Sequence, residues 1–394
     1  MRTLKNPKNL PNICFVSVLM AILLFGLIRT VFLPKDVNEY ENRYSEKVLT
    51  PTLSNIANQT FQDSLEDALA DQIPTAQRLK KYYNILNSNV LNRFSKPFIY
   101  STSNNNKYIS YKELLLFGGD SIVYYTNDFS TRKPLLDTKA DNYNAVFAKY
   151  PQLDFYAYFI EKDTDINFET NAKVGSSEYI LSLLNIPETN KGTFTINDYP
   201  TFRQYFYKTD HHWNHKGSYK AYTEILSLLN ITEDPIAHTS EKRVSTSFRG
   251  SKAAMIGDAV LKEDFWAYAY AFPKFEITIN GKPVADYGAQ NGPLPATISY
   301  GSFYGTDSGE VIFRSGREDL DNILIIGESY DNAILKLLAS HHNRTYSIDL
   351  RNYTAQMGHA FDFDTYVETN EIDTVLLIGN VDFWVMNEFS LEMN

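Results

Sequence analysis

The sequence predicts an α/β fold in which a parallel sheet is flanked by helices on both faces. Four apolar runs indicate its buried strands, at residues 155–160, 322–326, 346–350 and 374–378. Segments with helical spacing lie between such runs, among them residues 176–184 and 216–229. Strands that are joined through helices run parallel, and the helices cover both faces of the sheet.

The first 33 residues predict an uncleaved signal-anchor. Arg2, Lys5 and Lys8 precede an apolar run at residues 13–28, and this positive charge places the N-terminus in the cytoplasm. Residues 30–33 extend the run toward the roughly 20 residues that a membrane span needs. No Ala-x-Ala cleavage pattern follows, so we expect a single-pass protein of the cell membrane with an extracytoplasmic C-terminal domain.

Two further parts follow this transmembrane helix. Residues 34–100 are predicted to be a juxtamembrane and helical segment, because apolar residues recur at helical spacing over residues 58–92, where Pro74 divides two helices. Residues 101–394 are predicted to be the catalytic domain, with a β-rich insertion at about 245–318. The insertion is indicated by three strand-like runs, at residues 274–280, 282–287 and 310–314.

Composition excludes several classes of protein. The chain has 394 residues, of which 43% are hydrophobic, and this suffices for a sizeable buried core. Its formal net charge is -10 and no basic patch follows residue 36, so nucleic acid is not an expected partner. The single cysteine, Cys14, lies inside the first apolar run, so no internal disulfide can form.

Two short motifs carry the candidate chemistry. They are Thr-Asp-His-His-Trp at residues 209–213 and Gly-Glu-Ser-Tyr at residues 327–330. In an extended segment Asp210 and His212 point to the same side, so Asp210 can orient the imidazole while His212 activates a serine. Ser329 is the candidate nucleophile, because it stands between a buried strand and a helix predicted over residues 331–338. The N–H groups that begin such a helix suit the oxyanion of acyl transfer.

These residues resemble the DHHW family of bacterial cell-envelope proteins, named after the tetrapeptide that stands here at residues 210–213. That family is similar in turn to the alginate O-acetylation proteins of the SGNH hydrolase-like superfamily. The resemblance covers roughly residues 107–382 and includes residues 348–353; family members often have Asp in place of Glu328. It implies an SGNH-like catalytic domain that acetylates a polysaccharide acceptor. It also implies that a membrane-bound O-acyltransferase partner supplies the acetyl donor.

Two competing sites are less favoured. Gly-Asp-Ser at residues 119–121 resembles an esterase block, but the apolar runs on both sides indicate a strand, a tight turn and a strand. Asp210, His211, His212 and His215 suggest a metal site. Adjacent histidines are expected to point apart, and no Cys or His-x-x-x-His supports such a site, so neither a metal nor a cofactor is expected. The alternative to catalysis is that Asp210 caps the next helix while His212 packs beneath Trp213.

Further residues are candidates for the oxyanion or the substrate. The backbone amide of Ser329 is the first oxyanion donor to consider. Because strand ends converge on the ligand crevice of an α/β sheet, the other donors considered are Asn332, Gly379 and Asn380. Tyr330 and Trp213 are candidates to flank an acceptor sugar, although burial beneath the site would explain them equally.

The function that follows is a membrane-anchored O-acetyltransferase that acts outside the cytoplasm on a cell-envelope or secreted polysaccharide. Ser329 would accept an acetyl group as an ester, and a sugar hydroxyl deprotonated by His212 would then take it. A carbohydrate acetylesterase would use the same triad with water as the acceptor. A non-catalytic polysaccharide-binding or assembly protein is the third possibility, although such a protein would be free to lose any member of the triad.

Overall fold

The computed structural model describes residues 10–35, 37–38, 43–72, 79, 82–83, 86, 107–109, 114–255, 261–290, 292–295, 298–387 and 391. The chain divides into two compact units, residues 1–93 and 94–394.

The first unit contains a long apolar helix, α1 (Leu10–Phe32). Among the described residues it is the one helix long and apolar enough to cross a membrane, although a signal sequence has the same properties. The segment after it is tied to α3 (Thr60–Gln72), because the Gln72 side chain accepts from the Lys35 N–H at 2.6 Å and donates to the Lys35 carbonyl at 2.9 Å. The remaining elements are β1 (Val37–Asn38), β2 (Arg43–Tyr44) and α2 (Leu53–Ala57). The second predicted helix, beyond Pro74, lies almost wholly outside the described residues.

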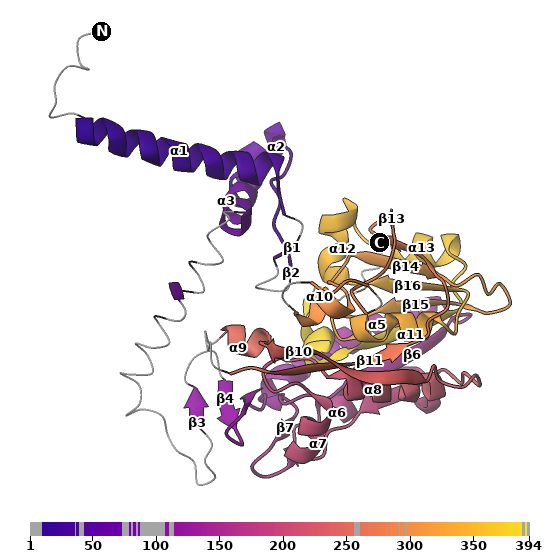
Figure 1. The fold of residues 1–394 in the computed structure, drawn as a ribbon. Helices are drawn as coiled ribbons and strands as arrows, with labels where there is room; N and C mark the ends of the chain where they lie inside the picture. The colour runs from indigo at the N-terminus through magenta and orange to yellow at the C-terminus, as the bar shows by residue number, and fades with distance from the viewer. Residues whose placement is uncertain are drawn as a thin grey trace. The chain divides into compact units, whose positions relative to one another are not determined.

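The second unit is built on an eight-stranded sheet with the order β13-β12-β14-β16-β15-β17-β6-β9 (Figure 1). Five neighbouring strands run parallel: β16 (Arg344–Ile348), β15 (Asn322–Ile326), β17 (Thr374–Asn380), β6 (Asp154–Ile160) and β9 (Lys191–Phe194). The predicted α/β class is therefore confirmed. The strand predicted at 346–350 begins and ends two residues earlier. It ends at Ile348 because Asp349 caps α12 (Leu350–Met357) by accepting from the Arg351 N–H.

Both faces of this sheet are buried, as the apolar strands predict. Alternate residues of β15 enter different cores: Ile323 and Ile325 join one, and Leu324 and Ile326 join the other. Figure 1 shows helices on either side of the sheet. Residues from α7 (Tyr199–Tyr205), α8 (His215–Leu228) and α11 (Leu335–Ala339) belong to the first core. The second core takes residues from α5 (Phe129–Lys149), α6 (Ser176–Leu183), α12 (Leu350–Met357), α13 (Phe363–Thr369) and α14 (Val381–Val385).

The β-rich region departs from the predicted insertion in two ways. Its first strands, β10 (His238–Phe248) and β11 (Glu263–Tyr270), form a separate antiparallel ribbon that begins before residue 245. The other three, β12 (Glu276–Ile279), β13 (Lys282–Val284) and β14 (Glu310–Arg314), continue the central sheet as an antiparallel edge. They join it because β14 pairs with β16 along its full length, which a local sequence pattern does not encode.

The remaining elements are short. Residues 119–121 lie in a hairpin turn between β4 (Leu114–Phe117) and β5 (Ser121–Tyr124), as predicted. Others are β3 (Lys107–Ile109), β7 (Ile166–Asn167), β8 (Ala172–Lys173), α9 (Ser251–Met255) and α10 (Tyr300–Tyr304), with 3-10 turns at Glu188–Asn190 and Asp331–Ala333.

Candidate active site

Two side chains of one loop and a third from a distant part of the chain form a hydrogen-bonded series. His212 Nδ1 lies 2.6 Å from Asp210 Oδ1, and His212 Nε2 lies 2.7 Å from Ser329 Oγ. The Asp210 carboxylate can only accept hydrogen bonds, so His212 Nδ1 carries the proton and donates it toward Asp210. His212 Nε2 is then free to accept a hydrogen bond from the Ser329 hydroxyl. Each of the three residues is less than 8% exposed, at 4%, 1% and 7% in the order Asp210, His212, Ser329. This is the arrangement that activates a serine.

The Asp210–His212 contact arises from a turn and not from the extended segment that the sequence predicts. Phe206 pairs with Trp213 in an antiparallel bridge, and the Tyr207 N–H donates to the His212 carbonyl at 3.2 Å, which closes a loop. Within it Asp210 Oδ1 also accepts from the backbone N–H of His212 at 3.0 Å. A short Asp side chain bonded two residues ahead is the usual means of stabilising such a turn.

The second oxygen of Asp210 is held by residues that no sequence motif indicated. Asp210 Oδ2 accepts from the Ser251 N–H at 2.7 Å. Gly250 permits this approach, because a Cβ there would lie 2.4 Å from the Asp210 Cβ and 2.6 Å from its Cα. Glu263 fixes the preceding residue, accepting from the N–H and the hydroxyl of Thr209 at 2.7 and 2.8 Å.

Asp210 is consequently a carboxylate held in its charged form. Burial by itself would raise its pKa, but the charge and hydrogen bond of His212, with the Ser251 N–H, hold the pKa well below the ordinary value. A permanently ionised Asp210 orients the imidazole and would stabilise the imidazolium formed when Ser329 loses its proton.

An aromatic ring supports the imidazole from beneath. The rings of His212 and Tyr300 are parallel within 1°, with centroids 3.8 Å apart. The Tyr300 hydroxyl accepts from Trp213 Nε1 at 3.1 Å and donates to the Tyr330 carbonyl at 3.2 Å. Trp213 and Tyr330 are both 0% exposed, so they pack beneath the site and have no surface against which a sugar could lie.

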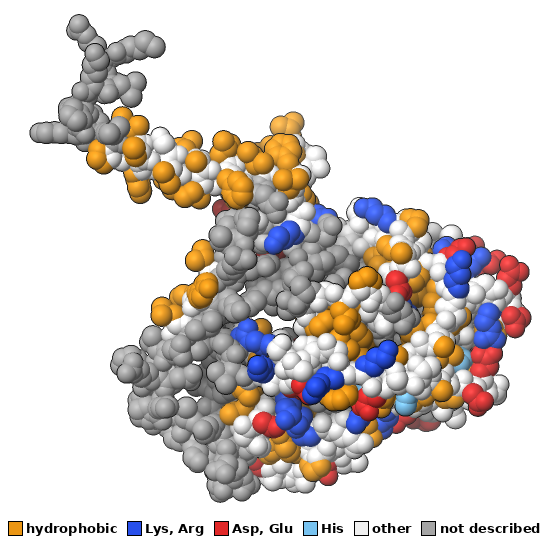
Figure 2. All heavy atoms as spheres, viewed as in Figure 1, with side chains coloured by type: hydrophobic (Ala, Val, Ile, Leu, Met, Phe, Trp, Pro, Cys, Tyr) orange, Lys and Arg blue, Asp and Glu red, His pale blue; other side chains and the backbone are white. Residues whose placement is uncertain are grey.

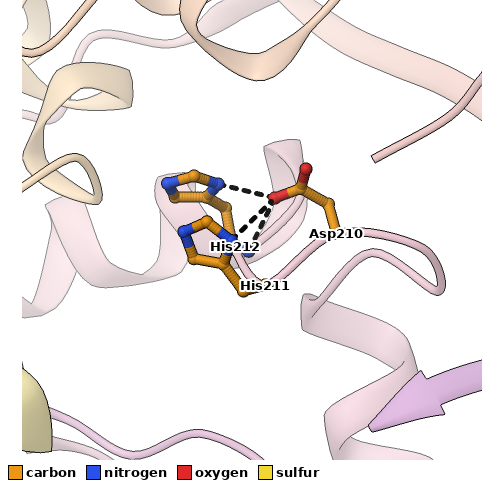
Figure 3. A group of neighbouring side chains, drawn as sticks. All are labelled: Asp210, His211 and His212. Atoms are coloured by element: carbon orange, nitrogen blue, oxygen red, sulfur yellow. Dashed lines mark hydrogen bonds and ion pairs between the residues drawn. The ribbon is translucent and has the colours of Figure 1, made fainter. Parts of the chain in front are cut away.

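His211 does not point away from His212, contrary to the sequence expectation. The two ring centroids are 3.8 Å apart (Figure 3), and His211 Nδ1 lies 2.6 Å from Ser251 Oγ. One ligand-type atom from each of Asp210, His211 and His212 lies within 4.8 Å of the others, so residue spacing alone does not argue against a metal. Two of those residues are bonded to each other in the series described above, and burial together with the charge of His212 lowers the pKa of His211.

Ser329 follows β15 in a tight turn. The Asp331 N–H donates to the Glu328 carbonyl at 2.9 Å, and the chain then forms a 3-10 turn and the short helix α11 in place of the continuous helix predicted over residues 331–338. Gly327 begins the turn, where a Cβ would lie 2.4 Å from Asp331 Oδ2. Ser329 thus stands at the C-terminal edge of the parallel strands, where α/β proteins bind their ligands.

The side chains predicted as oxyanion donors are engaged elsewhere. Asn332 Nδ2 donates to Asp307 Oδ1 at 3.0 Å, while Asn380 Nδ2 and its backbone N–H donate to Glu328 Oε1 at 2.6 and 2.7 Å. Backbone N–H groups in the Ser329 turn therefore remain the better candidates for the oxyanion.

Comparison with known proteins gives a likeness in fold. No protein-family model matches the chain, and a search of curated proteins finds no relative. A DHHW family protein from Eubacterium siraeum has a solved structure that aligns at a TM-score of 0.51 with 14% identity, over 73% of this chain and 94% of that one. The chain has the fold of a DHHW family protein.

Bacillus cereus PatB1 shares this fold. The structure of PatB1 with a sulfonyl adduct aligns at a TM-score of 0.54 with 18% identity, over 71% of this chain and 97% of PatB1. A second structure of PatB1 gives 0.53 with 19% identity. The O-acetyltransferase domain of Pseudomonas putida AlgJ also matches, with 10% identity and a TM-score of 0.40.

Proposed function

We propose that this protein is an O-acetyltransferase that modifies a polysaccharide outside the cytoplasm through an acetyl-Ser329 intermediate. The observation that carries the proposal is the unbroken series from Asp210 through His212 to Ser329, with contacts of 2.6 and 2.7 Å. PatB1, which shares the fold, has been obtained with a sulfonyl adduct, and such adducts form when a nucleophile attacks an electrophilic sulfonyl group.

The chemistry proceeds in two steps through the same residues. His212 Nε2 takes the proton of Ser329 as Oγ attacks the carbonyl carbon of an acetyl donor, and the leaving group departs with that proton. His212 Nε2 then takes the proton of a sugar hydroxyl, whose oxygen attacks the acetyl-serine. The sugar leaves as its O-acetyl ester and Ser329 recovers its proton. Asp210, ionised throughout, stabilises the imidazolium in both steps.

The proposal also covers the source of the acetyl group and the orientation of the chain in the membrane. The resemblance to the DHHW and alginate O-acetylation proteins supports a donor supplied across the membrane by a membrane-bound O-acyltransferase. Arg2, Lys5 and Lys8 before α1 support a cytoplasmic N-terminus, which would place the second unit outside.

The test is intact-mass analysis of the chain after exposure to p-nitrophenyl acetate, for wild type beside Ser329→Ala and His212→Ala. We expect an acetyl adduct in wild type that both variants lack. Ser121→Ala is the matched control, because that serine follows Gly-Asp in a hairpin and bonds Tyr199 at 2.9 Å. Transfer of acetyl to an added oligosaccharide supports the transferase, release of acetate alone supports an acetylesterase, and neither adduct nor acetate in wild type refutes catalysis.

A further inference from the structure

His211 is the exposed neighbour of His212. The other rings in contact with the His212 imidazole are buried, since Tyr300 and Tyr330 are 1% and 0% exposed, whereas 30% of the His211 side chain is exposed. The His211 and His212 ring centroids are 3.8 Å apart, and His212 Nε2 lies 2.7 Å from Ser329 Oγ. A molecule that enters from solvent to meet an acetyl group on Ser329 is therefore expected to contact His211.

Asp210 determines where the protons of both imidazoles lie. Its Oδ1 atom is 2.6 Å from His212 Nδ1 and 3.7 Å from His211 Nδ1. A negative charge beside Nδ1 favours the tautomer that carries its proton there. The Nδ1–H of His211 then donates to Ser251 Oγ at 2.6 Å, so the remaining nitrogen, Nε2, carries no proton in the neutral ring.

His211 stays neutral at neutral pH. Burial of most of the ring and the charge of His212, opposed by that of Asp210, hold the pKa of His211 well below its ordinary value. Its Nε2 has no hydrogen-bond partner among the residues that the structure describes. This atom can therefore accept a hydrogen bond from a ligand but cannot donate one.

The two imidazoles present their Nε2 atoms in the same direction. Figure 3 shows the Nδ1 atom of each ring turned toward Asp210 and the Nε2 atom on the side of the ring away from it. In the proposed reaction His212 Nε2 takes the proton of the hydroxyl that is acetylated. A second hydroxyl on the adjacent carbon of the same acceptor can reach the neighbouring ring and donate to His211 Nε2. An acceptor with a lone hydroxyl, or with an ether in the second position, cannot make this hydrogen bond.

Charge does not explain how an acceptor would be held. Near His211, Lys162 is paired with Asp382 at 2.6 Å and Lys252 with Asp163 at 2.5 Å. On the face of the second unit that is in view in Figure 2, acidic and basic side chains are interspersed. Hydrogen bonds to a neutral acceptor therefore suit this site better than attraction of a polyanion.

We propose that His211 is an acceptor-binding residue and that it selects an acceptor with hydroxyls on adjacent carbons, as sugar rings have. The inference rests on the proposed acetyl transfer, which it deepens. In the transfer step His212 Nε2 takes the proton of one hydroxyl, that oxygen bonds to the acetyl carbon, and the bond from this carbon to Ser329 Oγ breaks as Oγ recovers its proton from His212. The neighbouring hydroxyl keeps its proton throughout and donates it in a hydrogen bond to His211 Nε2.

The first test is a competition for one acetyl-enzyme. The full chain is given p-nitrophenyl acetate with equal concentrations of trans-cyclohexane-1,2-diol and trans-2-methoxycyclohexanol, and the two acetyl esters are measured by mass spectrometry. Wild type is expected to favour the diol roughly three- to tenfold per hydroxyl, the effect of one neutral hydrogen bond. Both acceptors react with the same intermediate, so the product ratio does not depend on how fast that intermediate forms.

Variants of His211 separate hydrogen bonding from other causes. His211→Ala should bring the ratio to one per hydroxyl, whereas His211→Gln, whose amide oxygen can accept in place of Nε2, should keep part of the preference. His359→Ala, at an exposed histidine outside the site, should keep the wild-type ratio. Cyclohexanol has neither the second oxygen nor the ether methyl group, and wild type should disfavour it as well relative to His211→Ala. Equal use of cyclohexanol and the diol would show that the ether is excluded by its size.

The second test needs no acetyl transfer. Diethyl pyrocarbonate modifies unprotonated imidazole nitrogens, and the full chain with Ser329→Ala lacks the hydroxyl that this reagent would also attack. Residue-resolved mass spectrometry should find His211 modified, and the diol should slow this modification in a saturable manner while the methyl ether should not. His359 should be modified at the same rate with and without the diol.

The outcomes are distinguishable. Protection of His211 by the diol with no acetyl transfer to any acceptor overturns the proposed transferase and leaves the binding inference standing. Transfer to both acceptors at a ratio that His211→Ala does not change overturns the inference and leaves the transferase standing. The inference is also overturned if the diol and the ether protect His211 equally, if neither protects it, or if His211 does not react.

Discussion

Glu328 is expected to make the folded protein less stable as pH rises through neutrality. Its side chain is buried, and burial, opposed by the charge of Arg351, raises the pKa from 4.5 to about 7. Between these values the folded state holds a proton that the unfolded state has lost, so the free energy of unfolding falls as pH rises. At about 1.36 kcal/mol per pH unit, the whole range corresponds to about 3 kcal/mol.

Glu328→Gln tests this reasoning. The amide does not ionise, yet its oxygen can still accept the two hydrogen bonds that Asn380 donates to Glu328 Oε1. Wild type should therefore lose about 3 kcal/mol more than the variant between pH 5 and pH 8.5. A unit of about 300 residues unfolds with roughly 0.6 kcal/mol/K of entropy, so the difference in Tm should be about 5 °C.

The assay is thermal unfolding followed by circular dichroism at both pH values. Asp331, whose pKa burial also raises, is present in both proteins; the Glu328 charge adds to that shift, so the comparison reports Glu328 together with its effect on Asp331. Glu188→Gln is the control, since that side chain is 86% exposed and its loss should not alter the pH dependence. Equal falls in Tm for wild type and Glu328→Gln would refute the argument.

Two further substitutions test the supports of the site, and a third tests a buried ion pair. Gly250→Ala should lower the Tm by about 2–5 °C, because the steric overlap costs roughly 1–3 kcal/mol, and it should also reduce ester hydrolysis. Gly292→Ala is the control, since a Cβ there meets nothing within 4 Å, and it should change neither the Tm nor the hydrolysis. Tyr300→Leu should lower kcat for p-nitrophenyl acetate more than Tyr300→Phe, which keeps the stacked ring; equal losses would contradict a role for stacking. Lys252→Met should cost about 3–5 kcal/mol in urea unfolding, because it leaves Asp163 buried without its ion-pair partner at 2.5 Å. Adding Asp163→Leu should restore part of the loss.

Much of the sheet could be predicted because each buried strand is visible in the sequence as a short apolar run. The run at 322–326 is apolar at every position after Asn322, and the structure gives the same bounds for β15. Pairing is different, since it depends on which edge is free once the other strands have assembled. The sequence showed that residues 310–314 form a strand, but it could not show that this strand extends the central sheet.

The candidate site likewise contains some residues that could be predicted from the sequence and others that could not. Asp210 and His212 are two residues apart and Ser329 follows a clear strand, so short patterns revealed all three. Gly250, Ser251 and Tyr300 come from other parts of the chain, and a glycine, a serine and a tyrosine in short elements have no distinguishing local pattern. Their positions become meaningful only when tertiary packing brings them to Asp210 and His212.

The four residues from Asp210 to Trp213 have separate tasks, which explains why they occur together. Asp210 joins the imidazole to the Ser251 N–H, and His211 reaches the Ser251 hydroxyl. His212 faces Ser329, while Trp213 holds the hydroxyl of the tyrosine stacked under that imidazole. Because one loop closed by the Phe206–Trp213 bridge makes all these contacts, displacing any of the four is expected to change the distance between the His212 imidazole and the Ser329 hydroxyl. A motif of adjacent residues can therefore specify a site whose other half lies more than a hundred residues away.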